Sequence, residues 1–433
     1  MTTNNQGVGT RELALMILLE IERGEKSHIV LRQVLEKYQY LEKKERAFIT
    51  RVTEGTLEHM IELDYILNQF SKVKVNKMKP VIRNILRSAV YQLKYMDSVP
   101  DSAVCNEAVK LAVKKGFGTL RGFVNGVLRN VARGLDQVEY PTEGIERLSV
   151  VYSMPEWILK LWKKTYDLDV IESMLQAFQE ETPVTIRCNL AKTTPENLKE
   201  SLQKEGVTVT PHPYLSYAFR IQDYDHLSEL ESFQKGEFYV QDISSMQVAE
   251  WAEPKEGDYV IDVCAAPGGK AIHLAEKLSG TGYVEARDLT EYKVALIEEN
   301  IERSGLDNIE AVCQDATIND EASYEKADIL IADLPCSGLG ILGKKPDLKS
   351  KMTVEMAKGL ADLQRQILTV VHNYVKPGGK LLYSTCTINR EENEDNTAWF
   401  VENFPEFEKI REKQMLPGSD MGDGFYIAEF RKQ

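Results

Sequence analysis

Two cysteines in the C-terminal half of the chain stand in contexts that favour a reaction on a pyrimidine ring. Cys336 lies three residues after Asp333 and directly after Pro335, and Cys386 ends a run of Tyr-Ser-Thr-Cys. Both runs are predicted to end strands of one sheet. Two thiols and a carboxylate arriving at one sheet edge could attack, hold and release a pyrimidine.

Methylation of a pyrimidine at C5 needs a nucleophile, because that carbon is too weakly nucleophilic to attack a sulfonium methyl group unaided. A thiolate that adds to C6 turns C5 into an enamine-like carbon. Free cysteine is only about 3% thiolate at pH 7, so the site has to supply positive potential or a base. A carboxyl group hydrogen-bonded to ring N3 and exocyclic N4 stabilises the adduct, and we assign this role to Asp333. A second cysteine nearby can assist the elimination that follows.

A glycine-rich turn upstream is predicted to bind a nucleotide-type cofactor. A strand ends at Asp262 and Pro-Gly-Gly-Lys then opens a helix, which leaves free backbone amides at the mouth of the sheet. The turn lacks the Gly-x-Gly-x-x-Gly spacing, so a single nucleoside fits better than a dinucleotide. Asp288 is placed to accept both ribose hydroxyl protons, and Asp315 to meet an adenine edge. The candidate binding residues are Cys264, Ala265, Ala266, Pro267, Gly268, Gly269, Lys270, Asp288, Asp315 and Asp333.

The elements that must position these residues alternate between strands and helices from Ile243 onward, which predicts an α/β domain over 241–433 with a parallel sheet covered by helices. The expected helices include 291–304 and 354–375. The expected strands are 259–263, 283–286, 309–313, 329–332 and 380–383, with a final pair near 407–410 and 424–430.

Two further domains are predicted before this one. Apolar residues at helical spacing from Arg11 to Arg133 indicate an all-α domain over 8–136, with Ser102 as the cap of one helix. A linker near 137–144 leads to a small α+β module over 145–240, in which Thr194 caps a helix. The strands expected in this module are 184–188, 207–210, 218–221 and 238–240.

Charge is distributed unevenly along the 433 residues. The formal net charge is −14, which by itself discourages binding to a polyanion. Residues 1–140 nevertheless hold 22 basic and 16 acidic side chains, and within 71–130 the balance is 12 to 3. A basic stripe in the helical domain favours a nucleic-acid partner, although solvated lysines on a helix surface would give the same pattern.

The remaining cysteines and the N-terminus point away from other protein classes. With no Cys-x-x-Cys pair and no His cluster, the sequence argues against a zinc site or a disulfide framework. We interpret Cys105, Cys188, Cys264 and Cys313 as small buried side chains. The first residues carry no secretory signal pattern, and no apolar run reaches membrane-spanning length, so we expect a cytoplasmic protein.

At the cysteine motifs the chain resembles the RNA 5-methylcytosine methyltransferases that use S-adenosylmethionine. The resemblance lies in 264–270, in 333–338, and in 384–387 with Glu391-Glu392-Asn393; the N-terminal helices resemble the RNA-binding fold of the antitermination factor NusB. The combination of NusB-like helices with these methyltransferase motifs, together with the segments 152–157 and 423–426, resembles the small-subunit ribosomal RNA enzymes of the RsmB (Sun or Fmu) family. That family implies a multidomain protein: a NusB-like domain, a small α+β module and a Rossmann-like class I methyltransferase domain.

The resemblance also implies roles for the site residues. Cys386 is expected to be the nucleophile, Cys336 the residue that aids product release and Asp333 a contact to the target cytosine, while the glycine-rich turn with Asp288 and Asp315 holds S-adenosylmethionine. The expected reaction is methylation of cytosine 967 of 16S rRNA before subunit assembly, by a monomer without metal. The chain departs from the family at Gly343-Lys344-Lys345 ahead of Pro-Asp, where two arginines and a histidine are usual, and at Ser350, where an aromatic is common.

Other interpretations remain open at this point. A DNA cytosine enzyme would use Cys336 alone as the nucleophile. The target could be another RNA cytosine, or the chain could be an RNA-binding assembly or antitermination factor whose methyltransferase fold is not catalytic. A small-molecule methyltransferase is disfavoured by the basic N-terminal stripe.

Overall fold

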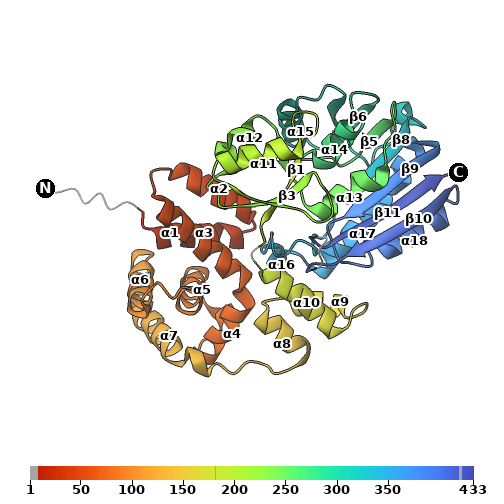
Figure 1. The fold of residues 1–433 in the computed structure, drawn as a ribbon. Coiled ribbons are helices and arrows are strands. Elements are labelled where there is room, and N and C mark those ends of the chain that lie inside the picture. Colours follow the sequence, from red (N-terminus) through yellow and green to blue (C-terminus); the bar gives the residue numbers. More distant parts are fainter. Residues whose placement is uncertain (1–7, 181, 419–421) are drawn as a thin grey trace. The chain divides into compact units, whose positions relative to one another are not determined.

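The computed structural model describes residues 8–180, 182–418 and 422–433 (Figure 1). Contacts divide the chain into two compact units. The first, called here the helical unit, contains the residues up to Glu172 together with Lys344–Lys351. The second, called the α/β unit, contains Ser173–Gly343 and Met352–Gln433. The segment Lys344–Lys351 therefore interrupts the α/β unit in sequence but makes its contacts in the helical unit.

The helical unit confirms the all-α prediction. Its core centres on α5, where Ile82, Ile85, Leu86 and Val90 are buried on one face. The predicted cap at Ser102 is wrong, because the helix already begins at Asp101 and its N-cap is Pro100, whose fixed φ suits a helix start. The helices of this unit are α1 (Thr10–Glu22), α2 (Ser27–Lys37), α3 (Lys43–Glu58), α4 (Met60–Phe70), α5 (Pro80–Tyr95), α6 (Asp101–Lys114), α7 (Arg121–Gly134), α8 (Gly144–Val151) and α9 (Glu156–Trp162). Helix α10 (Leu168–Gln179) begins in the helical unit and continues into the α/β unit.

A four-stranded antiparallel sheet follows in the order β2-β3-β1-β4. The Thr194 hydroxyl accepts a hydrogen bond from the Asn197 amide, so the predicted cap of α11 is present. Helices α8 and α9 group with the helical unit, whereas the sheet groups with the α/β unit. The elements are β1 (Val184–Cys188), α11 (Pro195–Lys204), β2 (Thr208–Pro211), β3 (Ala218–Gln222), α12 (Glu231–Gln234) and β4 (Phe238–Val240).

The larger sheet has seven strands in the order β10-β11-β9-β8-β5-β6-β7. Strands β5 to β9 pair in parallel, and β11 and β10 add antiparallel at one edge, which confirms the Rossmann-like prediction. The strands are β5 (Tyr259–Asp262), β6 (Tyr283–Asp288), β7 (Ile309–Cys313), β8 (Ala327–Asp333), β9 (Val375–Thr385), β10 (Phe407–Met415) and β11 (Phe425–Lys432).

Helices cover both faces of this sheet (Figure 1). One apolar cluster contains residues of α13 (Ile243–Ala252), α14 (Gly269–Lys277) and α15 (Glu291–Ser304). A second cluster contains residues of α17 (Val354–Val371) and α18 (Glu394–Asn403). The short helix α16 (Leu348–Lys351) lies in the segment that groups with the helical unit. None of the helices formed by the described residues is long and apolar enough to cross a membrane.

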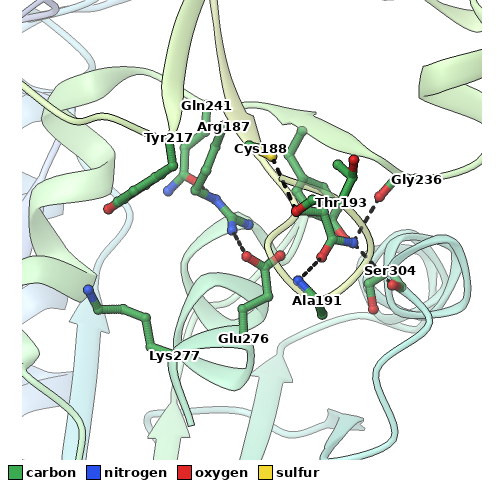
Figure 2. A network of polar contacts seen from close by, with 12 residues as sticks. Arg187, Cys188, Ala191, Thr193, Tyr217, Gly236, Gln241, Glu276, Lys277 and Ser304 are labelled. Carbon is green, nitrogen blue, oxygen red and sulfur yellow. Dashed lines mark hydrogen bonds and ion pairs between the residues drawn. The ribbon is translucent and has the colours of Figure 1, made fainter. Parts of the chain in front are cut away.

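A buried network fastens the smaller sheet to α14 (Figure 2). Arg187 of β1 is fully buried; its Nη1 donates to the Glu276 carboxylate of α14, and its Nε donates to Gln241 Oε1 at 2.8 Å. The guanidinium also lies 4.7 Å from the ring centroid of Tyr239. Because α14 begins at the glycine-rich turn, this network helps to fix the helix that carries the predicted cofactor site.

Candidate functional site

The two cysteines meet beyond the ends of neighbouring strands. Strands β8 and β9 pair in parallel with Asp333 opposite Ser384, so the loops that follow leave the sheet at the same edge. The Sγ atoms of Cys336 and Cys386 lie 3.3 Å apart, and both side chains are half-buried. The structure thus brings together the two thiols that the sequence placed 50 residues apart.

Asp333 lies at the same edge with a positive partner. Lys270 Nζ donates to Asp333 Oδ2 at 2.7 Å, and the Ser384 hydroxyl donates to Asp333 Oδ1 at 2.7 Å. Burial lowers the pKa of Lys270, but the charge and hydrogen bond of Asp333 outweigh burial, and Cys386 adds to the effect, so the net pKa is raised. Lys270 therefore stays cationic and supplies positive potential beside Cys386.

Sequence reasoning missed this role of Lys270. The residue was grouped with the cofactor turn, because Pro-Gly-Gly-Lys reads as a helix start that binds an anion. Its ammonium group instead pairs with Asp333, 63 residues later in the chain. A lysine in the first turn of α14, at the edge where β5 and β8 both end, was the available signal.

The two thiols differ in their surroundings. The hydrogen bond to Cys386 raises the pKa of Cys336 well above its ordinary value, and burial and the charges of Cys386 and Glu392 raise it further. Either sulfur could be the donor in this contact, and the raised pKa of Cys336 favours Cys336 as the thiol that keeps its proton. This asymmetry suits Cys386 for attack and Cys336 for a supporting role.

Close backbone packing holds the loop of Cys386 in place. The Gly340 amide donates to the Cys386 carbonyl at 3.0 Å, and the Gly424 amide donates to the Gly340 carbonyl at 2.9 Å. A Cβ at position 340 would lie 1.9 Å from the Gly424 carbonyl oxygen and 2.9 Å from the Cys386 carbonyl oxygen. Only glycine fits here without moving the backbone that carries Cys386.

We expect Gly340→Ala to lower methyl transfer at least about tenfold and to cost roughly 1–3 kcal/mol of stability, because the added methyl group displaces the Cys386 loop. Single-turnover transfer and urea denaturation measure the two effects. Gly359→Ala is the matched control: no atom lies within 4 Å of its added Cβ. It should keep full activity and gain some stability, as alanine favours helix over glycine. Wild-type activity in Gly340→Ala would show that this packing does not position the thiol.

The glycine-rich turn has the features that a nucleoside cofactor needs. Gly268 adopts φ +105°, a left-handed conformation that favours glycine, and leads directly into α14. Asp262 at the end of β5 is 1% exposed, and its Oδ2 has no hydrogen-bond partner among the described residues. Burial, followed by the charge of Asp333, raises the pKa of Asp262 to about 8. With this pKa the carboxyl is mostly protonated near pH 7, so the orphaned buried Oδ2 beside the helix start can donate to or accept from a polar ligand.

The two downstream acids differ in how much acceptor capacity they retain. Asp288 is buried; its Oδ2 accepts from the Ala266 amide at 3.0 Å, and its Oδ1 accepts from the Leu289 amide at 2.7 Å and from Lys293 Nζ at 2.8 Å. One acceptor position on Oδ2 remains, so binding two ribose hydroxyls requires the half-exposed Lys293 to move away. Asp315 accepts from the amide and hydroxyl of Thr317, at 2.8 and 2.6 Å.

The other four cysteines differ in burial. Cys105 and Cys188 are buried, as predicted, and Cys264 is half-buried. The interpretation of Cys313 as buried is wrong: it ends the edge strand β7 and is exposed. Over the described residues, no group of three or more His, Cys, Asp or Glu side chains is arranged to hold a metal ion. A cavity of about 440 Å³ near Tyr217, His273 and Glu276 is lined by none of the predicted site residues.

The departures from the family pattern fall partly on a crowded backbone. A Cβ at Gly343 would lie 2.7 Å from the Phe178 carbonyl oxygen, which leaves no room for an arginine at this position. Ser350 donates its hydroxyl to the Asp347 carbonyl at 3.0 Å, and Asp347 accepts from the Ser27 amide at 3.3 Å within the helical unit. The residues that depart from the family pattern at 343 and 350 thus make specific contacts with the rest of this chain.

Comparison with known proteins agrees with these features along the whole chain. Residues 249–431 match a family described as 16S rRNA methyltransferase RsmB/F, residues 9–133 match the NusB family, and residues 154–225 match a ferredoxin-like domain of RsmF/B-like methyltransferases. The probable ribosomal RNA small subunit methyltransferase B of Bacillus subtilis is 34% identical, over 98% of both chains. The ribosomal RNA small subunit methyltransferase B of Vibrio cholerae is 29% identical, over 91% of both.

Solved structures agree with this fold. The crystal structure of PH0851 has a TM-score of 0.84 and 25% identity, and the match covers 98% of each chain. The structure of NSun6 from Pyrococcus horikoshii with SFG has a TM-score of 0.59 and covers 65% of this chain and 99% of that one; at 24% identity it supports the fold alone. The resemblance found in the sequence motifs is thereby confirmed, and the chain belongs to the RsmB/F family of 16S rRNA methyltransferases.

Proposed function

We propose that this chain methylates C5 of a cytosine in 16S rRNA, at position 967, with S-adenosylmethionine as the methyl donor and through a covalent Cys386–C6 adduct. The observation that carries the proposal is the thiol pair at 3.3 Å beside the Lys270–Asp333 ion pair. Methylation at C5 needs a nucleophilic thiol, a second thiol that keeps its proton, a carboxyl group and a cation, and all four groups lie at this sheet edge.

The attack step uses the positive potential at the sheet edge. Lys270 stabilises the Cys386 thiolate, which adds to C6 of the cytosine. Asp333 accepts a hydrogen bond from the N4 amino group, and its protonated form donates to N3, which stabilises the negative charge that the addition places on the ring. The Ser384 hydroxyl and Lys270 hold the two Asp333 oxygens in place. The cofactor supplies an electrophilic methyl group, and the glycine-rich turn, Asp262 and Asp288 are the residues that would bind it.

The release step uses the second thiol. After methyl transfer a water molecule acting as base takes the proton from C5, the electron pair of that C–H bond re-forms the C5–C6 double bond, and the Cys386 sulfur leaves as a thiolate. Cys336 donates a hydrogen bond to that sulfur, which stabilises it as a leaving group. The same hydrogen bond favours Cys386 over Cys336 as the nucleophile.

We propose that basic residues of the helical unit bind the 16S rRNA before the small ribosomal subunit is assembled. Lys72, Lys74, Lys77 and Lys79 are exposed and lie within eight residues of one another. Each lysine that contacts a phosphate contributes a counterion-release term to RNA affinity. We further propose that the protein acts as a monomer.

Replacing these four lysines by glutamine in the full chain should weaken RNA binding and reduce the slope of log affinity against log salt by up to about 3. The cofactor affinity, measured by calorimetry, should stay unchanged. Lys110→Gln is the matched control, because Lys110 is already paired with Glu107 at 2.7 Å. An unchanged salt slope in the fourfold variant would remove this role from the segment.

The proposed reaction is tested with a 16S rRNA transcript and labelled S-adenosylmethionine. The expected result is one methyl group per transcript, found by bisulfite sequencing as a single protected cytosine at position 967. Protection of a different cytosine would correct the target. Cofactor binding without transfer to any RNA would instead favour an assembly factor with a non-catalytic methyltransferase fold.

A further inference from the structure

A buried carboxylate that the proposed chemistry does not use joins the two cysteine loops. Glu392 lies six residues after Cys386 and is fully buried. Its Oε2 accepts from the Ser337 amide at 2.9 Å, and its Oε1 accepts from the Ser337 hydroxyl. Ser337 directly follows Cys336. The Glu392 carboxylate, in the loop that follows Cys386, therefore binds Ser337, the residue next to Cys336 in the other loop.

The hydrogen bonds around Glu392 indicate the protonation state of its carboxyl group. Asn389 Nδ2 donates to Oε1 at 2.8 Å, and Gln364 Nε2 donates to Oε2 at 3.1 Å, so both oxygens have two donors each. The Ser337 amide, Asn389 Nδ2 and Gln364 Nε2 can only donate, so three of the four hydrogen bonds need an accepting oxygen on Glu392, which favours the carboxylate form. Burial raises the pKa of Glu392, and the hydrogen bonds from Ser337, Asn389 and Gln364 offset only part of that rise, so the net pKa is raised.

Further bonds fix Cys336 on both sides. Gln364 Nε2 also donates to the Pro335 carbonyl at 2.9 Å, so the residues before and after Cys336 are both held. The Ser337 hydroxyl lies 2.7 Å from the hydroxyl of Thr387, which is the residue directly after Cys386. Glu392 is the charged centre of this arrangement, and its charge also contributes to the raised pKa of Cys336.

We propose that Glu392 is a positioning residue that holds Cys336 within hydrogen-bond reach of Cys386 and thereby sets how fast the methylated RNA is released. The inference rests on the two-thiol chemistry proposed above. Glu392 touches neither the substrate nor the cofactor in this account. It acts through Ser337 and Pro335, whose backbone carries Cys336.

The test uses the full chain with Glu392→Gln, which keeps the size of the side chain but loses the charge and replaces one acceptor by a donor. We expect the covalent protein–RNA adduct to persist, with release slowed about tenfold or more, as for loss of a hydrogen bond to a charged group. Transfer of the first methyl group in a single turnover should change little, since Cys386, Asp333 and Lys270 are untouched. Denaturing gels resolve the adduct, and calorimetry checks cofactor affinity.

Glu391→Gln is the matched control, because it makes the same chemical change one residue earlier at a half-buried side chain. It should release RNA at the wild-type rate. Ser337→Ala, which removes one donor and keeps the backbone amide, should slow release to an intermediate degree and serves if Glu392→Gln does not fold. Rescue by Glu392→Asp, in part, is expected because a carboxylate is restored.

Release of RNA from Glu392→Gln at the wild-type rate would overturn the inference. A loss of single-turnover methyl transfer of about tenfold or more, with no adduct formed, would also overturn it. Absence of methyl transfer by the wild-type protein would instead overturn the proposed function before Glu392 is in question. The adduct of a Cys336→Ala protein provides the reference for slow release, so the two failures can be told apart.

Discussion

Replacing Cys386 by alanine is expected to reduce methyl transfer at least about a thousandfold, because the bond to C6 cannot form without the nucleophile. Replacing Cys336 should have a different effect. The adduct should form and accept the methyl group, but the Cys386 sulfur should leave slowly, since its hydrogen-bond donor at 3.3 Å is gone. The two variants are compared by filter-bound label and by denaturing gels after incubation with RNA and S-adenosylmethionine.

Cys313→Ala serves as the control for this pair, since Cys313 is exposed at the end of the edge strand β7. It should methylate and release RNA as the wild-type protein does. If Cys386→Ala accumulates the adduct and Cys336→Ala is inactive, the two roles are reversed. That outcome would match an enzyme that attacks through the Pro-Cys thiol.

Replacing Arg187 by methionine is expected to destabilise the protein by roughly 3–5 kcal/mol, because it leaves Glu276 buried without its partner. Burial already raises the pKa of Glu276, and the charge and hydrogen bond of Arg187 oppose that rise. Without Arg187 the folded-state pKa rises further above the unfolded value. The variant therefore loses stability as pH increases above the ordinary glutamate range, and urea denaturation at several pH values measures the loss.

The double variant Arg187→Met with Glu276→Leu separates a buried charge from lost packing. Replacing both partners by apolar side chains of similar size should recover most of the stability and remove the added pH dependence. Equal destabilisation in the single and double variants would show that packing around Tyr239 and Gln241 matters more than the charge pair. Because α14 carries the glycine-rich turn, the single variant should also bind the cofactor more weakly.

Much of the architecture could be predicted because local patterns determine it. The buried runs that end at Asp333 and Thr385 are strands β8 and β9, and parallel neighbours bring their following loops to one edge. The meeting of the two thiols followed from that rule. The helical unit followed from apolar spacing, as in the buried face of α5.

The features that could not be predicted depend on contacts between distant residues. Lys270 pairs with Asp333 63 residues away, and Glu392 binds Ser337 55 residues away; neither leaves a periodic signal in the sequence. The exposure of Cys313 depends on β7 being the edge strand, which strand order decides. The grouping of Lys344–Lys351 with the helical unit likewise follows from tertiary contacts.

The most direct test of the central claim is to locate the covalent bond. Cys336→Ala protein is incubated with 16S rRNA and S-adenosylmethionine, the RNA is digested to nucleotides, and the modified peptide is identified by mass spectrometry. The account predicts a methylated cytidine attached to the peptide that contains Cys386. An adduct on any other cysteine, or methylated RNA formed without any protein adduct, would contradict it.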